Sequence, residues 1–217
     1  MTTTTYLCFA IILIALVCSC TVFFQRNPEL YLRLFPYFMV FVIVNWSWGS
    51  YLAAHNKSNL ILFNLYIAVG VIFYLFVTSQ IIRNRLVKKI IVFSFVIYPI
   101  IACWNMFRPG PTIFILTQCL GCLLIVAFCI YYFLELFQLT KAVNLLAQPA
   151  FWICSGLLFF YACNFPDYAL LVLVKKPPQF IVQNMTIISD FLDALLYLSF
   201  TIAFLCRIKI NRSTQPS

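Results

Sequence analysis

Acidic residues, histidine and glycine are scarce in this sequence. Its 217 residues include five Asp and Glu residues, one His and five Gly residues. Because His55 is the only histidine and lies in a polar segment, we expect neither a histidine metal site nor a histidine-assisted nucleophile. The sequence has no glycine-rich phosphate loop, and no lysine deep in its last apolar run that could form a Schiff base with retinal. These absences predict that the chain is not an enzyme and binds no metal and no cofactor.

Charge of either sign is also rare. Charged residues make up 9% of the chain and hydrophobic residues 65%, and the mean hydropathy is +1.02. A water-soluble domain of this composition would expose most of its apolar surface, whereas a lipid bilayer accommodates that surface. The net charge of +9 does not indicate nucleic-acid binding, because Lys and Arg fall in short clusters between apolar runs. The composition therefore predicts an integral membrane protein that is surrounded by the lipid bilayer.

Cysteine, in contrast, is abundant, with ten residues. Eight of them lie inside apolar runs, where cysteine behaves as a small hydrophobic side chain. Cys119 and Cys122 have the spacing of a redox pair, but no βαβ pattern surrounds them. We therefore predict neither a disulfide framework nor a zinc site.

Seven apolar runs are long enough to cross a bilayer, which requires about 20 residues. They are residues 4–24, 31–54, 59–82, 90–106, 112–136, 150–174 and 180–206. The sixth is interrupted by Asn164-Phe165-Pro166-Asp167, so this span is expected either to kink there or to stop early. The pattern predicts an all-α, polytopic transmembrane helix bundle in which residues 1–206 form a single domain. Residues 207–217 are predicted to be a basic cytoplasmic tail without regular structure.

The loop charges predict the orientation of the seven spans. With the N-terminus outside and the C-terminus in the cytoplasm, ten of the 14 Lys and Arg residues lie on the cytoplasmic side. The other four are Lys57, Arg108, Lys175 and Lys176. No basic residue precedes the first run, so we interpret that run as a retained span, with cleavage or lipidation at Cys20 as the alternative. The expected location is the inner (cytoplasmic) membrane of the cell.

Polar residues of the seventh run fall on one helical face. Thr186, Asp190, Asp193, Tyr197 and Thr201 are spaced at i, i+4, i+7, i+11 and i+15, and this stripe should point into the bundle. Two carboxylates this close do not both ionise easily in a medium of low dielectric constant, so one of them could hold a proton. Asp190 and Asp193, with Tyr197, are therefore candidates for ion or proton coupling.

A structural role for the two aspartates stays open beside this functional one. If the span begins late, both carboxylates lie in its outer third and could pair with Lys175, Lys176 or Arg108. Similarly, Glu135 is expected to lie at the interface and to pair with a loop cation such as Arg83. Four asparagines are expected to make polar contacts between helices, namely Asn45, Asn64, Asn105 and Asn164.

Two stretches carry a distinctive pattern of aromatic and amide residues. They are Asn59, Phe63, Asn64 and Tyr66 with Phe73-Tyr74 in the third run, and Pro149-Ala150-Phe151-Trp152, Gly156-Leu157 and Tyr161 in the sixth. This pattern resembles small seven-helix integral membrane proteins of Bacteroidota type, and loosely the seven-helix membrane regions of bacterial sensor kinases. The family pattern also has an acidic residue in the second or third span, and this sequence has none there. The resemblance implies a sensory or accessory membrane protein and no particular reaction.

Two functions are consistent with these observations. The first is a sensory or signalling accessory protein that acts through a protein partner, because the cytoplasmic loops are too short to signal alone. The alternative is a small proton- or cation-coupled transporter that uses Asp190 and Asp193 as its coupling site.

Overall fold

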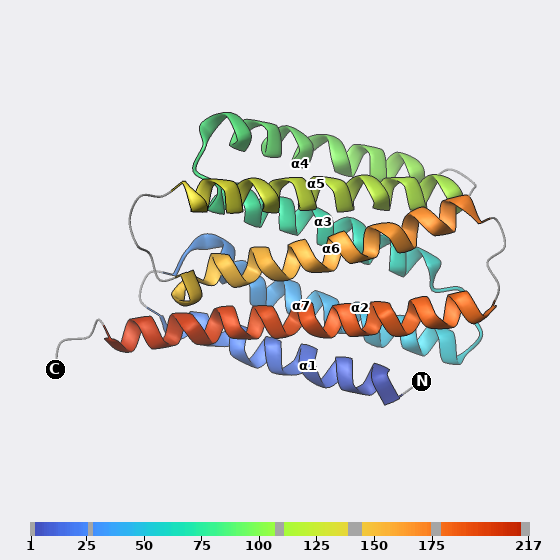
Figure 1. Cartoon of the computed structure of the whole chain (residues 1–217). Helices are drawn as coiled ribbons and strands as arrows, with labels where there is room; N and C mark the ends of the chain where they lie inside the picture. The colour runs from blue at the N-terminus through green and yellow to red at the C-terminus, as the bar shows by residue number, and fades with distance from the viewer. Residues whose placement is uncertain (1–2, 26–27, 107–110, 139–144, 175–178, 214–217) are drawn as a thin grey trace.

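The apolar runs form seven long helices in the computed structural model of the chain (Figure 1). The structure describes residues 3–25, 28–106, 111–138, 145–174 and 179–213, and these contain helices and no strand. The helices are α1 (Thr3–Cys20), α2 (Leu30–Ala54), α3 (Leu60–Ile81), α4 (Arg85–Met106), α5 (Pro111–Phe137), α6 (Pro149–Leu173) and α7 (Gln179–Ser213). Two short 3-10 helices, η1 (Thr21–Phe24) and η2 (Leu145–Ala147), adjoin α1 and α6. All seven α-helices contain a stretch that is long and apolar enough to cross a membrane.

The fourth helix begins five residues before the run predicted from hydropathy. Asn84 explains this start, because its Oδ1 accepts a hydrogen bond from the Leu86 N–H (2.9 Å), as expected of an N-cap residue. The cap places Arg85, Lys88 and Lys89 inside the first turns of α4. Arg and Lys are good helix formers, so these basic residues can belong to a helix. They form its polar end and are not part of a loop.

The sixth helix excludes one of its two expected outcomes, and the seventh extends beyond its predicted end. α6 is continuous and holds Pro166 within it, so the helix neither stops at Asn164 nor ends early. Such a proline removes one backbone hydrogen bond, to the carbonyl of Ala162, which the rest of a long helix tolerates. α7 extends to Ser213, so the first part of the predicted unstructured tail is helical. Residues 214–217 of the predicted tail lie outside the described residues.

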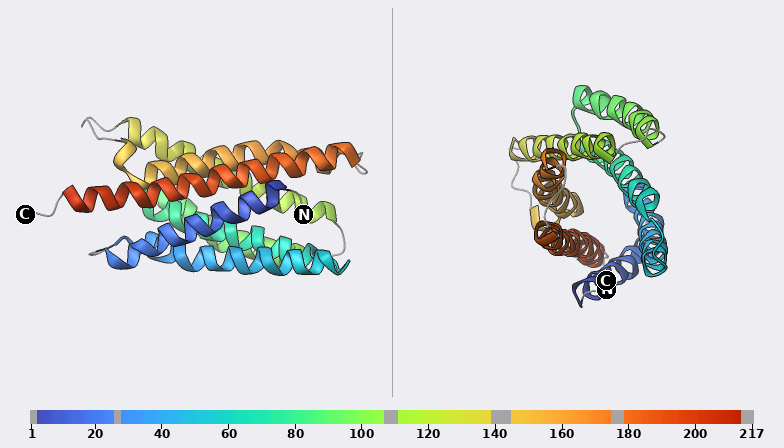
Figure 2. Two further views of the ribbon diagram at one scale, coloured as in Figure 1. Left: turned by 90° about the horizontal axis from the view of Figure 1, so that it is seen from below. Right: turned by 90° about the vertical axis from the view of Figure 1, so that its right-hand side faces the viewer.

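Six of the helices form a closed ring. Among the described residues, neighbours contact in the order α1, α2, α3, α5, α6 and α7, and α7 contacts α1 again. The end-on view in Figure 2 shows this arrangement, and the two chain termini lie at opposite ends of the bundle (Figure 1). We call the end at which α1 begins the amino end and the end at which α1 stops the carboxyl end.

The remaining helix, α4, packs on the outside of the ring against α3 and α5. It buries Ile91, Tyr98 and Ala102 on one face and leaves many of its other apolar side chains exposed. Gly121 of α5 makes the close approach possible, because a Cβ atom there would lie 3.0 Å from the Tyr98 hydroxyl oxygen and 2.8 Å from Cγ2 of Val71. A lateral helix held by one face is stable only where its other faces meet an apolar environment.

Aromatic side chains fill the carboxyl half of the ring. Phe35 of α2 makes edge-to-face contacts with Phe73, Phe200 and Phe204, at centroid distances of 5.0, 5.1 and 5.5 Å. Phe38 stacks on Phe73 at 4.2 Å. Such pairs add to the energy of simple burial and fix the relative positions of the helices that contribute them. We call Phe35, Phe38, Phe73, Phe200 and Phe204 the aromatic layer.

The turn between α2 and α3 has a defined geometry at the amino end. The Lys57 N–H donates to the Leu52 carbonyl (2.9 Å), and the Asn56 N–H donates to the Ala53 carbonyl (3.1 Å). These two bonds form a Schellman motif, with Asn56 at the left-handed position (φ 53°). Asparagine tolerates this conformation better than most residues, so the sequence itself sets where α2 stops and α3 can start.

Candidate functional site

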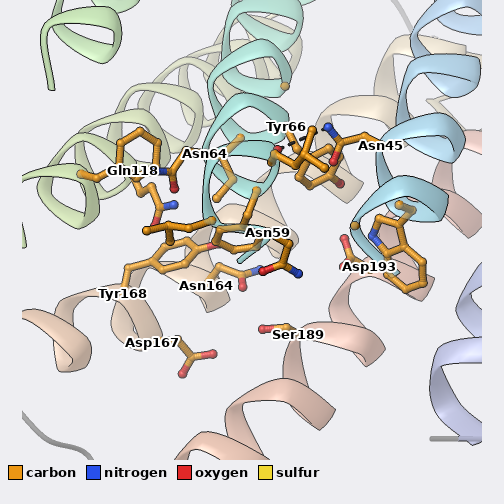
Figure 3. Close-up of a pocket in the computed structure, with 18 of the residues that line it drawn as sticks. Asn45, Asn59, Asn64, Tyr66, Gln118, Asn164, Asp167, Tyr168, Ser189 and Asp193 are labelled. Atoms are coloured by element: carbon orange, nitrogen blue, oxygen red, sulfur yellow. Dashed lines mark hydrogen bonds between the residues drawn. The ribbon is translucent and has the colours of Figure 1, made fainter. Parts of the chain in front are cut away.

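A cavity of about 1240 Å³ occupies the amino half of the ring (Figure 3). Its described walls come from α2, α3, α5, α6 and α7, and Asn105 of α4 contributes at the edge. Ala53, Ala54 and Asn59, which flank the α2–α3 turn, also line it, so the cavity reaches the amino end of the bundle. The lining extends along α2 from Ala54 to Phe38, which corresponds to roughly 24 Å at 1.5 Å per residue.

The floor of the cavity is formed by Phe38, Gly70, Tyr74 and Tyr161. Phe38 belongs to the aromatic layer, and the Tyr74 ring contacts both Phe38 and Tyr161, at centroid distances of 5.3 and 5.9 Å. The fully buried members of the layer lie directly beyond this floor. The cavity is therefore closed toward the carboxyl end in this structure.

The polar groups of the lining are carboxylates, amides and hydroxyls. Asp167, Ser189 and Asp193 face the same space as a set of amide side chains (Figure 3). The amides in the lining are Asn45, Asn59, Asn64, Asn105, Gln118 and Asn164. Asp190 lines the cavity as well, and the described lining contains no Lys, Arg or His. Among the described residues, the cavity is thus acidic and rich in hydrogen-bonding groups, but most of its exposed wall is apolar.

Asp193 lies on the wall that α7 presents to α3. Its Oδ1 is buried and has no hydrogen-bond partner. Asp190, one helical turn earlier, lies within electrostatic range, as do the Tyr66 and Tyr197 side chains. The two tyrosine hydroxyls are 3.0 Å apart and join α3 to α7. A buried carboxylate oxygen without a partner is costly in protein, so this oxygen is a site at which a donor or a cation would bind favourably.

Asp190 is buried and has a different environment. Its backbone carbonyl accepts a hydrogen bond from the Cys8 thiol (2.9 Å), which joins α1 to α7. The proposed pairing of the two aspartates with Lys175, Lys176 or Arg108 concerns cations outside the described residues. The side chain of Thr186, the first member of the predicted stripe, is also outside the described part of the structure. Thr201, the last member, donates to the Tyr197 carbonyl (2.9 Å) and is buried below the cavity.

Asp167 is a residue of the cavity that the sequence analysis did not assign to a site. The segment around Pro166 suggested a break in the span, yet α6 continues through it and carries Asp167 into the cavity wall. Oδ2 of Asp167 is buried without a hydrogen-bond partner, as Oδ1 of Asp193 is. Asn164 and Asp167 are three residues apart, and this spacing on an apolar helix could have indicated a shared polar face. The same reasoning could have found Gln118, an amide in the first third of the fifth run.

The four asparagines expected between helices have different environments. Asn45 of α2 donates to the Leu62 carbonyl of α3 (3.3 Å), and Asn105 of α4 donates to the Thr117 hydroxyl of α5. Asn164 donates to the Phe160 carbonyl (2.9 Å), which lies within its own helix. Asn64 is buried in the cavity wall. Two of the four thus connect neighbouring helices, and all four line the cavity.

A second, smaller cavity of about 540 Å³ lies at the carboxyl end. It is lined by residues from the start of α2, the end of α3, the end of α5 and the start of α6. Glu135 is here, and its Oε2 accepts a hydrogen bond from the Arg83 backbone N–H (3.0 Å), so the carboxylate caps the α3–α4 turn. The buried Tyr132 hydroxyl in this lining has no hydrogen-bond partner.

Comparisons with known proteins do not identify the chain: no protein-family model, no curated protein and no solved structure matches it. The resemblance to seven-helix membrane proteins of Bacteroidota type is therefore still a prediction from the sequence.

Proposed function

We propose that the protein crosses a bacterial inner membrane seven times, with the N-terminus outside, and binds a small molecule in the cavity at its amino end. The binding event is sensed and passed to a protein partner at the cytoplasmic end. One observation carries this proposal. The cavity reaches the amino end of the bundle, holds two buried carboxylate oxygens that lack partners, and is closed on the other side.

The distribution of apolar and charged side chains supports the orientation. Large apolar residues are exposed on several helices, for example Phe93 and Ile100 on α4 and Val17 on α1. Arg83, Arg85, Lys88 and Lys89 gather at the α3–α4 turn of the carboxyl end. A cluster of basic residues at one end of a bundle favours the cytoplasmic side for that end. The cavity then opens to the outside of the cell.

The aromatic layer favours sensing over transport. Its rings are tightly packed between the cavity and the carboxyl end, so a bound molecule has no continuous path through the protein. The same rings connect the cavity floor to α2, α3 and α7, so a ligand that moves these helices at the amino half also moves them at the carboxyl end. The described connections at that end are short, and a partner is needed to convert the movement into a signal.

The experiment compares partner association between wild type and a variant whose cavity is filled. A Cβ atom at Gly49 would have no neighbour within 4 Å, so Gly49→Phe places a ring in open space in the lining. We expect a stoichiometric partner to co-purify with the wild-type protein from gently solubilised native membranes, and its amount or activity to change in Gly49→Phe. Gly49→Ala is the control and should behave as wild type. A wild-type protein that purifies alone would contradict the sensory proposal.

Transport is the second candidate, and the carboxyl-end cavity favours it. Two cavities at opposite ends, separated by one packed layer, are the arrangement of a protein that opens alternately to each side. In this alternative Asp193 is the coupling residue. Purified protein in liposomes would then carry protons or a cationic solute, and Asp193→Asn would abolish the flux. Flux that persists in Asp193→Asn would exclude this role.

A further inference from the structure

We propose that the cavity binds a small organic ammonium ion, that is, an amine cation with an apolar or aromatic body. Asp193 binds the ammonium group in this proposal, and Asp167, which lines the same cavity nearer the amino end, adds negative charge. The inference rests on the proposed function, namely that the cavity is a ligand site, and adds the chemical class of the ligand.

The charge of the cavity lining favours a cationic ligand. Asp167, Asp190 and Asp193 all contribute to the lining, and its described residues include no basic side chain. An anionic ligand would be repelled, and an apolar neutral ligand would leave the buried carboxylate oxygens of Asp167 and Asp193 without a partner. A cation supplies the missing charge, and it does so most effectively in the low dielectric of a membrane.

Two carboxylate oxygens of the lining lack hydrogen-bond partners, and their chemistry also favours an ammonium group. Oδ1 of Asp193 and Oδ2 of Asp167 are both buried without partners, and they lie on different helices, α7 and α6. An ionised carboxylate only accepts hydrogen bonds, so both atoms require N–H or O–H donors. At Asp193 an ammonium group offers up to three donors and a positive charge at once, which is the pairing that gives the strongest hydrogen bonds.

A bare metal ion fits this cavity less well than an organic cation does. No group of three or more His, Cys, Asp or Glu residues close enough to hold a metal is found among the described residues. A volume of about 1240 Å³ also far exceeds what one ion needs, and falls slightly above the range of cavities that hold drug-sized molecules. The site therefore fits a cation that carries a sizeable body.

The cavity wall also suits the apolar or aromatic body of such a cation. Trp46, Tyr66, Tyr74 and Tyr168 supply aromatic faces or edges to the wall, and Phe38 closes its inner end. Aromatic faces attract cations through their quadrupole and pack against apolar groups. The amides of Asn64 and Gln118 remain to orient any polar substituent of the ligand. This combination resembles a recognition site for an amine with a hydrophobic portion and does not suit a highly hydrated ion.

The experiment measures equilibrium binding to the purified full chain in lipid nanodiscs by calorimetry. The probes are phenethylamine, its neutral analogue 2-phenylethanol and its anionic analogue phenylacetate, with spermidine and tetraethylammonium as further cations and Mg²⁺ as the inorganic control. We expect at least one organic cation to bind, and phenylethanol, phenylacetate and Mg²⁺ to bind at least tenfold more weakly.

Variants locate the binding. Asp193→Asn should weaken binding of the cation at least tenfold and Asp167→Asn by a smaller factor, while Glu135→Gln, which changes an acid at the opposite end of the bundle, should leave the affinity unchanged. Each variant is first checked for a single symmetric peak in size-exclusion chromatography, and the two Asp variants provide independent tests if one does not fold. Affinity that is unchanged in both Asp variants would overturn the proposal.

The outcomes separate this inference from the proposed function. Equal or tighter binding of phenylethanol or phenylacetate, abolished by Gly49→Phe, would overturn the ligand class and leave the cavity as a ligand site. Absence of binding by every organic cation would also overturn the class, and the partner experiment with Gly49→Phe would still test the function independently. If neither experiment gives a response, both proposals are wrong.

Discussion

The hydroxyl oxygens of Tyr66 and Tyr197 lie 3.0 Å apart and form a polar bridge from α3 to α7 beside Asp193. Tyr66 lies in the cavity lining, and Tyr197 is almost completely buried behind it. Because α3 and α7 belong to opposite sides of the ring, this bond connects helices that the ring order does not make neighbours. It is a contact through which an occupant of the cavity can act on both helices.

Removing this bond should cost a small and non-additive amount of stability. Tyr66→Phe and Tyr197→Phe keep the rings and delete one hydroxyl each, so each should destabilise the protein by about 0.6 kcal/mol, the average for hydrogen bonds between membrane helices. The double variant should cost little more than either single one, because the bond can be lost only once. Thermal unfolding in detergent measures all three. Fully additive effects would show that the hydroxyls do not interact.

Gly156 of α6 should tolerate an added methyl group less well than Gly49 of α2 does. A Cβ atom there would lie 2.7 Å from Cβ of Ser199 on α7, which is closer than packed atoms allow. We expect Gly156→Ala to destabilise the protein by about 1–3 kcal/mol through overpacking between α6 and α7.

Gly49→Ala is the matched control, because a methyl group at Gly49 meets nothing within 4 Å. Alanine also favours a helix over glycine, so this variant should be neutral or slightly more stable. Both melting temperatures are measured in the same detergent. A Gly156→Ala protein as stable as Gly49→Ala would contradict the close packing of α6 on α7.

The aromatic layer should depend strongly on Phe35. This side chain is fully buried and contacts rings from α3 and α7, so Phe35→Ala leaves a cavity where three helices meet. We expect a loss of roughly 3 kcal/mol, at the lower end of the range for such truncations. The control is Phe93→Ala on α4, where the ring is 66% exposed. If truncation of Phe93 destabilises the protein as much as truncation of Phe35, the packing described for the aromatic layer is wrong.

Much of the secondary structure could be predicted from local sequence, because a span of about 20 apolar residues is sufficient to specify a membrane-length helix. The start of α4 was placed too late because Arg85, Lys88 and Lys89 resembled a loop, although Asn84 is a recognisable N-cap. The continuity of α6 could not be decided, since Pro166 within an apolar run fits either a kinked or a terminated helix. Capping residues would have improved both predictions.

The candidate site was predictable only in part. The one-face spacing of Asp190, Asp193 and Tyr197 could be found from helical periodicity, and the structure places these residues at or directly behind the cavity wall. The placement of Asp193 and Asp167 around one cavity could not be found in this way, because it depends on α6 and α7 being adjacent in the ring. The outside position of α4 also depends on side-chain fit, including Gly121, which a hydropathy pattern does not contain.

The central claim is that the cavity opens to the outer face of a seven-span protein. The most direct measurement places a thiol in the lining with Gly49→Cys and reacts it with a membrane-impermeant maleimide, in right-side-out and inside-out vesicles. Wild-type protein gives the background from the native cysteines. We predict labelling above background only in right-side-out vesicles, and protection of the thiol by the organic cation that binds. Labelling only in inside-out vesicles, or equal labelling in both, would contradict the account.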